Sequence, residues 1–378
     1  MKKILIFTDS FLPGFKGGGP ITSIANLVQL LNKDFDILIC TNNHDFGDDV
    51  PYKDIVFDEV TKYQGYNVVY LSQMDKKSIS KVIKNFEPDL LYLNSFFSKT
   101  TQIVMLLNKL TFQKNLVVAP RGELQQNALN IKKTKKAIYL SIYKLFGLYK
   151  NTYFHSTDAI ETKSIKELFN IDNITQLQNA VKIRKFEPLA KNANELKIIF
   201  VSRISKKKNL IFALKLLENL EENILFDIYG PKEDIEYWNE CQSIISRLPK
   251  NIKVLYKGSL AQSEIVNKMR EYHCFLFPTL SENFGHVIVE AMQAGLVPII
   301  SDQTPWLGLA NINAGWDIAL DDEQSYVKAI KELYMLESEK YTKKSLAIMK
   351  YIHKKLDMEK LALDYVIFFN KIIEGENR

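Results

Sequence analysis

Two glutamates with a loop and a helical pattern between them form the most informative stretch of this chain. Glu282 precedes Asn283-Phe284-Gly285-His286, and Glu290 follows inside an apolar helical pattern that ends at Gly295, a residue suited to a helix end. An apolar strand is predicted at 274–278, and another follows the helix. Strand, loop, helix and strand make a βαβ unit, and its loop lies where open parallel sheets bind ligands. The free amides at the helix start favour a phosphate group.

A pair of cations follows another predicted strand, 197–201. Arg203 and Lys208 have four residues between them, in a segment that also contains Lys206 and Lys207. A fixed guanidinium and ammonium could stabilise the negative charge of a bound anion, the guanidinium with bidentate geometry. The alternative is a solvated lysine-rich turn. We prefer that alternative for Lys206 and Lys207, and the functional interpretation for the other two.

These two segments resemble the retaining glycosyltransferases of family 4, which have the GT-B fold. That family carries two glutamates separated by seven residues, with Phe-Gly after the first, as in 282–290. It also carries Gly-Arg, four residues, and Lys-Gly; Ser202 and Asn209 occupy the two glycine positions here. Residues 301–306, Ser-Asp-Gln-Thr-Pro-Trp, are similar to members that build bacterial surface polysaccharides such as O-antigen or capsule.

The resemblance implies a role for each of these residues. Arg203 and Lys208 would bind the donor diphosphate, and Glu282 would contact the donor sugar, so these three are the expected catalytic residues. Glu290 would hold the ribose hydroxyls, and residues 283–286 would also lie on the donor side. The implied co-substrate is a nucleotide sugar, with UDP preferred and GDP next, and no metal or other cofactor is expected.

The first half of the chain offers two further candidates. The loop 14–20, Gly-Phe-Lys-Gly-Gly-Gly-Pro, follows the first predicted strand, and consecutive glycines let the backbone approach a ligand closely. The resemblance places Gly18 and Gly19 on the donor side; a flexible surface turn is the alternative. Arg121 stands where many relatives carry a histidine, and we expect it on the acceptor side. We name no histidine base, because His155 fits a structural role at least as well.

The segment 131–150 has the clearest surface pattern. Lysines at 132, 133, 135 and 136 precede apolar residues at helical spacing, namely Ile138, Ile142, Leu145 and Tyr149. One interpretation is docking onto an anionic membrane, which suits a lipid-linked acceptor and to which each lysine could add about 1 kcal/mol. The other is an amphipathic helix whose apolar stripe is core. Nucleic-acid binding is not predicted, because no recognised motif accompanies the charge.

Apolar runs alternate with helical patterns in both halves of the chain, which predicts parallel sheets with helical crossovers. The expected strands are 4–7, 37–40, 67–71, 90–93, 116–119, 197–201, 226–230, 252–258, 274–278 and 297–301. With the resemblance, this predicts an α/β protein of GT-B architecture, with two Rossmann-like doubly wound domains facing across a cleft. The acceptor domain would span 1–184 and the donor domain 185–357, and the last helix, about 358–378, would pack back on the first.

The bulk composition excludes several classes of protein. The chain has 378 residues, 46% of them apolar, which argues against disorder, and it has no apolar run long enough to span a bilayer. Its three scattered cysteines fit reduced core thiols in the cytoplasm, and the net charge of +6 does not select a partner. The Asp34-Phe35-Asp36 triplet imitates a metal motif, but it precedes a strand, and we treat it as accidental.

We therefore expect a retaining, metal-independent hexosyltransferase-type enzyme. It would move a sugar from a nucleotide diphosphate onto a glycan or lipid-linked oligosaccharide during bacterial surface polysaccharide synthesis, in the cytoplasm or at the inner face of the cell membrane. Two alternatives remain at this point. One is a GT-B sugar-nucleotide epimerase or phosphorylase, and the other is a non-enzymatic protein that binds a membrane or a polyanion.

Overall fold

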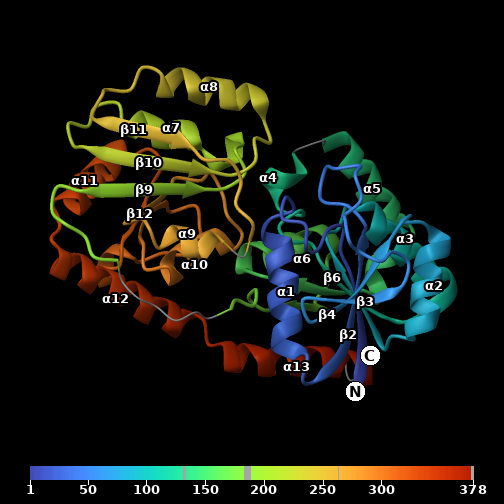
Figure 1. The fold of residues 1–378 in the computed structure, drawn as a ribbon. Helices are drawn as coiled ribbons and strands as arrows, with labels where there is room; N and C mark the ends of the chain where they lie inside the picture. The colour runs from blue at the N-terminus through green and yellow to red at the C-terminus, as the bar shows by residue number, and fades with distance from the viewer. Residues whose placement is uncertain (131–132, 183–188, 263, 376–378) are drawn as a thin grey trace. The chain divides into compact units, whose positions relative to one another are not determined.

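The computed structural model describes residues 1–130, 133–182, 189–262 and 264–375. The chain divides into two compact units (Figure 1). Unit 1 comprises Met1–Val181 together with Met358–Arg378, and unit 2 comprises Lys182–Asp357. The predicted boundary between residues 184 and 185 lies outside the described residues.

Unit 1 is built on an eight-stranded sheet with the strand order β3-β4-β2-β1-β5-β6-β7-β8. Its strands are β1 (Lys2–Phe7), β2 (Phe35–Asn42), β3 (Val60–Tyr63), β4 (Tyr66–Leu71), β5 (Leu90–Asn94), β6 (Asn115–Ala119), β7 (Tyr153–Ser156) and β8 (Ile174–Gln176). The expectation of wholly parallel pairing is wrong at one edge, where β3 and β4 are antiparallel. Gln64 and Gly65 join them with φ values of 49° and 92°, a two-residue turn that suits a hairpin.

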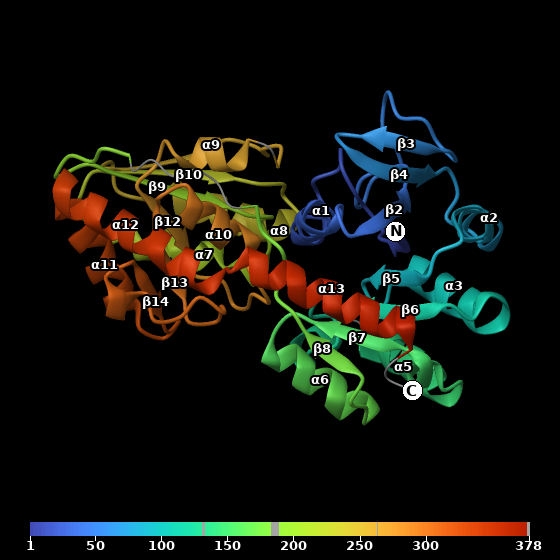
Figure 2. The ribbon, with the colours of Figure 1, turned by 90° about the horizontal axis from the view of Figure 1, so that it is seen from below.

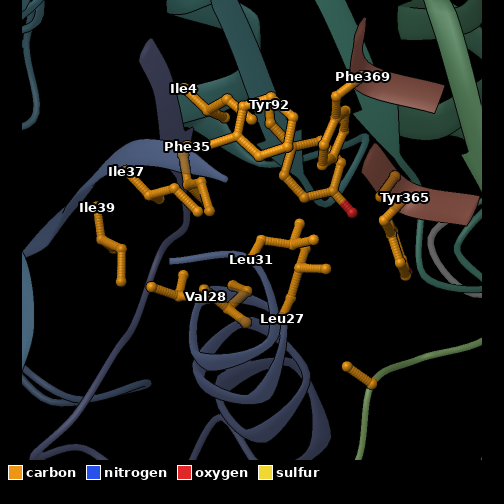
Figure 3. Close-up of a cluster of buried hydrophobic side chains, with 14 of the residues drawn as sticks. Ile4, Leu27, Val28, Leu31, Phe35, Ile37, Ile39, Tyr92, Tyr365 and Phe369 are labelled. Atoms are coloured by element: carbon orange, nitrogen blue, oxygen red, sulfur yellow. The ribbon is translucent and has the colours of Figure 1, made fainter. Parts of the chain in front are cut away.

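Alternate side chains of the unit 1 strands point to opposite faces of the sheet, and both faces are covered. Ile4, Ile6 and Tyr92 face α1 (Gly19–Leu31) and α13 (Met358–Glu374), and these residues share one buried apolar cluster (Figure 3). Leu5 and Phe7 belong to a second cluster on the other face. That face is covered by α2 (Lys76–Phe86), α3 (Lys99–Leu107), α5 (Lys133–Leu145) and α6 (Ala159–Phe169). Three short helices complete the unit: α4 (Gln126–Leu129), the π-helix η1 (Asn108–Phe112) and the 3₁₀-helix η2 (Leu148–Asn151).

The last helix, α13, is a part of the unit 1 core. Tyr365 and Phe369 are each 1% exposed, and Phe369 packs edge-on against Phe35 of β2 and Tyr92 of β5. Figure 3 shows Tyr365 and Phe369 pointing toward the strand residues, and Figure 2 shows α13 running past β5 and β7. The core of unit 1 therefore joins residues from both ends of the chain.

The predicted helix at 131–150 is confirmed as α5 and η2 within the described residues; residues 131 and 132 lie outside them. The alternative of a core stripe holds for Tyr149, which packs against the buried cluster, and is wrong for the three aliphatic residues. Ile138, Ile142 and Leu145 are 57%, 46% and 82% exposed, and the helix buries Tyr143 instead. Tyr143 lies among aromatic rings that include Phe96 and Phe169. The aromatic side of the helix faces the core, and the aliphatic side faces outward.

Unit 2 is built on a six-stranded sheet with the order β11-β10-β9-β12-β13-β14. Its strands are β9 (Leu196–Val201), β10 (Ile224–Tyr229), β11 (Ile252–Tyr256), β12 (Cys274–Phe277), β13 (Val297–Ser301) and β14 (Trp316–Ile318), and neighbouring strands pair in parallel. Its helices are η3 (Lys206–Lys208), α7 (Leu210–Leu216), α8 (Ile235–Ile245), α9 (Ile265–Met269), α10 (His286–Gln293), η4 (Ala310–Ile312), α11 (Glu323–Met335) and α12 (Ser338–Lys355). The chain runs from β9 outward to β11 and then returns to β12, so the strand order reverses between β9 and β12.

The cysteines and the lengths of the apolar helices bear on two smaller predictions. The three cysteines are free and buried, as expected of core thiols. A search of the described helices finds none that is both long enough and apolar enough to cross a membrane.

Candidate functional site

The strongest candidate site lies at the carboxyl ends of β9 and β12. These strands are neighbours in the unit 2 sheet, and the strand order reverses between them, which is where open α/β sheets bind ligands. Arg203 and Lys208 follow β9, and Glu282 follows β12. The topology therefore brings together two segments that are more than seventy residues apart in the sequence.

Lys208 and Glu282 form an ion pair between their Nζ and Oε1 atoms. Their side chains are only 13% and 11% exposed, so water screens this pair less than it would a surface pair. The Lys208 ammonium also lies 5.6 Å from the centre of the Phe277 ring. The buried Thr279 hydroxyl lies 3.5 Å from Glu282 Oε1 and 3.1 Å from the Lys207 carbonyl oxygen, so it links the two loops.

Arg203 is the more accessible of the two predicted cations. Its Nη1 atom lies 2.8 Å from Glu233 Oε1, and the two side chains are 38% and 42% exposed. Exposed ion pairs of this kind contribute about 0–1 kcal/mol, so an anionic ligand could replace Glu233 at small cost. The pKa of Lys207 is lowered, because its ammonium group loses solvation and because Lys208 and Arg203 add like charge, against the attraction of Glu282. Lys207 is exposed, so its interpretation as a solvated lysine stays a prediction.

The backbone explains why the chain can depart from the family pattern near these cations. Asn209 adopts the left-handed conformation, with φ 56° and ψ 41°, and its Nδ2 atom donates to the Pro278 carbonyl at 3.0 Å. Asparagine tolerates this conformation better than other residues with a side chain, so it can replace glycine here. The close backbone approach lies instead at Gly230, where an added Cβ would sit 1.8 Å from the Ser202 carbonyl oxygen.

The helix α10 begins directly after the second signature segment. Gly285 is its N-cap residue, with φ 73°, and an added Cβ would lie 2.8 Å from Ile288 Cδ1. The Phe284 carbonyl accepts a hydrogen bond from Trp306 Nε1 at 2.6 Å, and the Phe284 and His286 rings lie 4.7 Å apart. Trp306 therefore fixes the loop from which the first amides of α10 emerge. Those amides can bind an anion.

Glu290 lies on α10, beyond its first turn. Its Oε1 atom accepts a hydrogen bond from Gln262 Nε2 at 2.5 Å. Gln262 precedes α9 and was not among the predicted site residues; no sequence signal near it marks a site. The amide therefore extends the candidate site to the loop between β11 and α9.

Unit 1 has its own reversal of strand order, between β1 and β5. Asp9 follows β1, and its Oδ1 atom accepts a hydrogen bond from Thr100 Oγ1 of α3 at 2.7 Å. Burial raises the pKa of Asp9. The sequence analysis did not single out this carboxyl group, because one aspartate after a strand carries no distinctive spacing.

The glycine loop of unit 1 is fixed at its start and open at its end. Asp45 accepts hydrogen bonds from the Phe15 and Lys16 amides at 2.8 and 3.0 Å. Gly18 caps α1 with φ 66°, and an added Cβ there would meet nothing within 4 Å. Gly19 is the first residue of α1. The loop is thus held by Asp45, and Gly18 borders open space.

Arg121 lies in a polar network that is largely internal. Its guanidinium donates to Asn94 Oδ1 at 2.8 Å, to the Tyr92 hydroxyl at 3.0 Å, and to Asn179. The Tyr92 hydroxyl in turn lies 2.6 Å from Nδ1 of His155. His155 is fully buried, and burial, followed by the charge of Arg121, lowers its pKa to about 3. His155 is therefore neutral near pH 7.

The structure gathers most of the predicted residues in one unit. The predicted residues from Arg203 to Glu290 all belong to unit 2, whereas Gly18, Gly19 and Arg121 belong to unit 1. Among the described residues, no group of three or more His, Cys, Asp or Glu side chains could hold a metal ion.

Comparisons with known proteins agree with this division. Residues 181–353 match the family model for glycosyl transferases group 1, a range that covers nearly all of unit 2. An uncharacterised protein from the cps region of Klebsiella pneumoniae is 24% identical over 298 residues, which are 75% of this chain and 78% of that one. The GDP-mannose:cellobiosyl-diphosphopolyprenol alpha-mannosyltransferase of Xanthomonas campestris is 26% identical over 180 residues. That alignment spans 47% of each chain, about half of the mannosyltransferase.

Solved structures resemble the whole chain. Sucrose-phosphate synthase of Thermosynechococcus elongatus has a TM-score of 0.78, with 12% identity, over 99% of this chain and 100% of that one. HepE of Anabaena, in complex with UDP-glucose, has a TM-score of 0.75, with 15% identity, over 98% and 100%. The fold is GT-B. The predicted GT-B architecture of two Rossmann-like units is thereby confirmed, and the group 1 match supports glycosyl transfer as the class of activity.

Proposed function

We propose that this GT-B protein transfers a sugar from a UDP-sugar to a glycan or lipid-linked oligosaccharide, with retention of anomeric configuration. The observation that carries the proposal is the Lys208–Glu282 pair at the point where the unit 2 strand order reverses. Arg203 lies on the loop of Lys208, and the first amides of α10 follow the loop of Glu282. These loops thus bring together cations, amides and a carboxylate, the kinds of group that could bind the diphosphate and the hydroxyls of a nucleotide sugar.

The proposed chemistry assigns charge stabilisation to the cations. The bond between the sugar C1 and the diphosphate oxygen breaks, and the departing diphosphate gains negative charge that Arg203 and Lys208 stabilise. The acceptor hydroxyl oxygen attacks C1 from the same face, which retains the configuration. Its proton passes to the leaving phosphate. Glu282 accepts hydrogen bonds from the donor sugar hydroxyls, and Glu290 accepts them from the ribose, as carboxylates can do.

The choice of donor and setting rests on the similar proteins. HepE is seen with UDP-glucose, which favours UDP, whereas the Xanthomonas relative is described as using GDP-mannose, so GDP is the next candidate. One relative lies in a cps region, and another acts on a diphosphopolyprenol. These names favour surface polysaccharide synthesis at the cytoplasmic face of the membrane. We also propose that turnover needs no metal, since Arg203 and Lys208 could supply the positive charge that the diphosphate requires.

A donor screen tests this proposal. Purified protein is incubated with UDP- and GDP-sugars without acceptor or added metal, and released nucleotide is measured. We expect slow release from one donor, lost in Arg203→Ala and Lys208→Ala and retained in Lys206→Ala. Lys206 is an exposed neighbour in the same turn, so it is the matched control. Equal turnover in all three variants would contradict the site.

The same donor then separates the alternative reactions. An epimerase would return a changed nucleotide sugar and release no nucleotide. A phosphorylase of this fold would carry pyridoxal phosphate on a lysine, visible as aldimine absorbance of the purified protein. A non-enzymatic protein would show no turnover. In calorimetry it would bind UDP or GDP, or it would bind neither nucleotide. Addition of EDTA is expected to leave the rate within about twofold, and a larger loss would contradict metal independence.

A further inference from the structure

Positive charge is concentrated in one part of unit 1. Residues 90–157 contain ten lysines and arginines and one acidic residue, Glu123, while the whole chain has a net charge of +6. The carboxylate of Glu123 points inward, where it accepts hydrogen bonds from the Phe96 and Phe97 amides at 2.7 and 3.0 Å. The outer surface of this segment therefore carries cations without neighbouring acids from the same segment.

An exposed aliphatic row lies among these cations. On α5, Ile138, Ile142 and Leu145 point outward at helical spacing, and Phe146 directly after the helix is also exposed. The neighbouring α3 and η1 expose Leu106 and Leu110, also one turn apart.

Two contacts show that these two helical segments are neighbours. The Tyr139 hydroxyl lies 4.0 Å from Met105 Sδ, and Lys109 Nζ donates to the Phe146 carbonyl. We call the set of Leu106, Leu110, Ile138, Ile142 and Leu145 the aliphatic row, and the exposed Phe146 directly follows its last residue in the sequence. Both of its parts lie on the outer side of the helices that cover one face of the unit 1 sheet.

A cavity of about 880 Å³ lies beside this row, because its lining includes Lys109 and Gly147, the sequence neighbours of Leu110 and Phe146. Its walls include Lys109, Lys114 and Lys150, with the amide side chains of Gln113 and Asn151 between them. It opens at the amino ends of β6 and β7, because Asn115 and Tyr153 also line it. A cationic cavity next to exposed aliphatic side chains suits a ligand that is anionic at one end and apolar at the other.

We infer that this face of unit 1 docks onto an anionic phospholipid bilayer. The aliphatic row enters the boundary between headgroups and acyl chains, and the lysines of the cavity and of α5 pair with lipid phosphates. Helices with cations beside an aliphatic face bind membranes in this way, through buried apolar area together with attraction to anionic lipids. Nucleic acid would account for the charge but not for the aliphatic row. The inference does not depend on the proposed reaction, because membrane binding needs no donor.

Vesicle co-sedimentation tests the inference with the full chain. The vesicles are pure phosphatidylcholine or contain 30% phosphatidylglycerol, at about 50 and 200 mM salt. We expect binding to the anionic vesicles alone, weaker at the higher salt because salt screens the charges. The triple variant Lys114→Ser, Lys135→Ser, Lys150→Ser should bind about a hundredfold more weakly, roughly fivefold per lysine. Its control removes three exposed lysines of unit 2: Lys328→Ser, Lys340→Ser, Lys350→Ser.

A second pair of variants tests the aliphatic row together with Phe146. Ile142→Ser, Leu145→Ser and Phe146→Ser together should weaken binding at least tenfold at both salt concentrations. The matched control, Leu363→Ser with Ile367→Ser, removes exposed aliphatic side chains of α13, which lie in the same unit beside Asp364. All variants are first checked for folding by circular dichroism and for nucleotide affinity by calorimetry.

Three outcomes would overturn the inference. In the first, the wild-type chain does not bind anionic vesicles at low salt. In the second, the site variants and their controls lose vesicle binding equally. In the third, measured RNA binding is lost in the lysine variant while its vesicle binding is unchanged. The last outcome would assign the face to nucleic acid. Nucleotide affinity is measured separately. A failure of membrane binding therefore does not contradict the proposed transferase, and a failure to bind nucleotide does not contradict membrane docking.

Discussion

The two units have the same kind of sheet but use its carboxyl edge differently. In unit 2, the loops at the reversal of strand order carry the Lys208–Glu282 pair and the partly exposed Arg203. In unit 1, the charged side chains near the corresponding edge form hydrogen bonds with other residues of the same unit. Asp9 binds Thr100, and Arg121 binds Asn94, Tyr92 and Asn179.

The difference lies in what the charged groups bind. The unit 2 charges bind one another or an exposed glutamate, so a ligand can take over their partners. The Arg121 guanidinium binds three neutral side chains, and removing it would leave acceptors inside the protein without donors. Similar topology thus gives a candidate anion site in one unit and a largely internal hydrogen-bond network in the other.

The largest expected effect separates activity from stability at Lys208. Lys208→Ala should lower turnover of the donor about 100- to 1000-fold, because a fixed charge facing the leaving group is lost. The free energy of unfolding, measured in urea, should change by less than about 2 kcal/mol, because the Glu282 side chain is 11% exposed and lies 3.5 Å from the Thr279 hydroxyl, so its carboxylate keeps water and a hydrogen-bond donor as partners. A Lys208→Ala variant with a large loss of unfolding free energy and nearly normal turnover would show that the carboxyl edge of the unit 2 sheet is structural, like that of unit 1.

Arg121→Ala should show the opposite balance. We expect a loss of about 3 kcal/mol in the free energy of unfolding, because Asn94, Tyr92 and Asn179 lose a charged donor. Donor hydrolysis by the folded fraction should remain within about threefold. Transfer to an acceptor is measured in parallel, and a selective loss of transfer would support the acceptor-side role predicted for Arg121.

Acid should destabilise the unit 1 network through His155. Its pKa in the folded chain is about 3, below the unfolded value, because of burial and the charge of Arg121. The hydroxyls of Tyr92 and Tyr365 and the carbonyl of Leu177 are its other polar neighbours. The unfolded state therefore binds the proton first, and the contribution of neutral His155 is full above about pH 6.5 and lost as the pH falls toward 3. At pH 5 the loss is about 2 kcal/mol. His155→Gln should give a flatter dependence of the urea midpoint on pH, and an unchanged slope would contradict this.

The smallest effect concerns two glycines that begin helices. Gly285→Ala should cost about 2 kcal/mol, because φ is positive and the new Cβ would meet Ile288 at 2.8 Å. Gly18→Ala, with the same sign of φ but open space, should cost about 1 kcal/mol. Thermal unfolding of both variants measures the difference. Equal shifts would mean that the loop before α10 can relax.

Sequence reasoning succeeded where patterns were long and failed where they were short. The buried strands such as β1 and β12 are continuous apolar runs, and they were predicted with small errors at their ends. The strands β3, β8 and β14 have three or four residues each and are mostly exposed or intermediate, so they leave no pattern to read.

The candidate site shows a similar limit. Motif spacing found Lys208 and Glu282 separately, and the resemblance to a known family placed both on the donor. Their direct contact, however, follows from the pairing of β9 with β12, which spacing alone cannot supply. The Gln262 contact to Glu290 is likewise visible only in three dimensions.

The place of α13 has a consequence for synthesis of the chain. Tyr365 and Phe369 complete the apolar cluster of unit 1, yet the ribosome makes them only after the whole of unit 2. At typical elongation rates this delay is roughly 10 to 35 s. During that interval one face of the nascent first unit lacks its cover, while unit 2 is contiguous and can fold first. Chaperone contact during translation should therefore be concentrated on the sheet face that α13 later covers, near Phe35 and Tyr92.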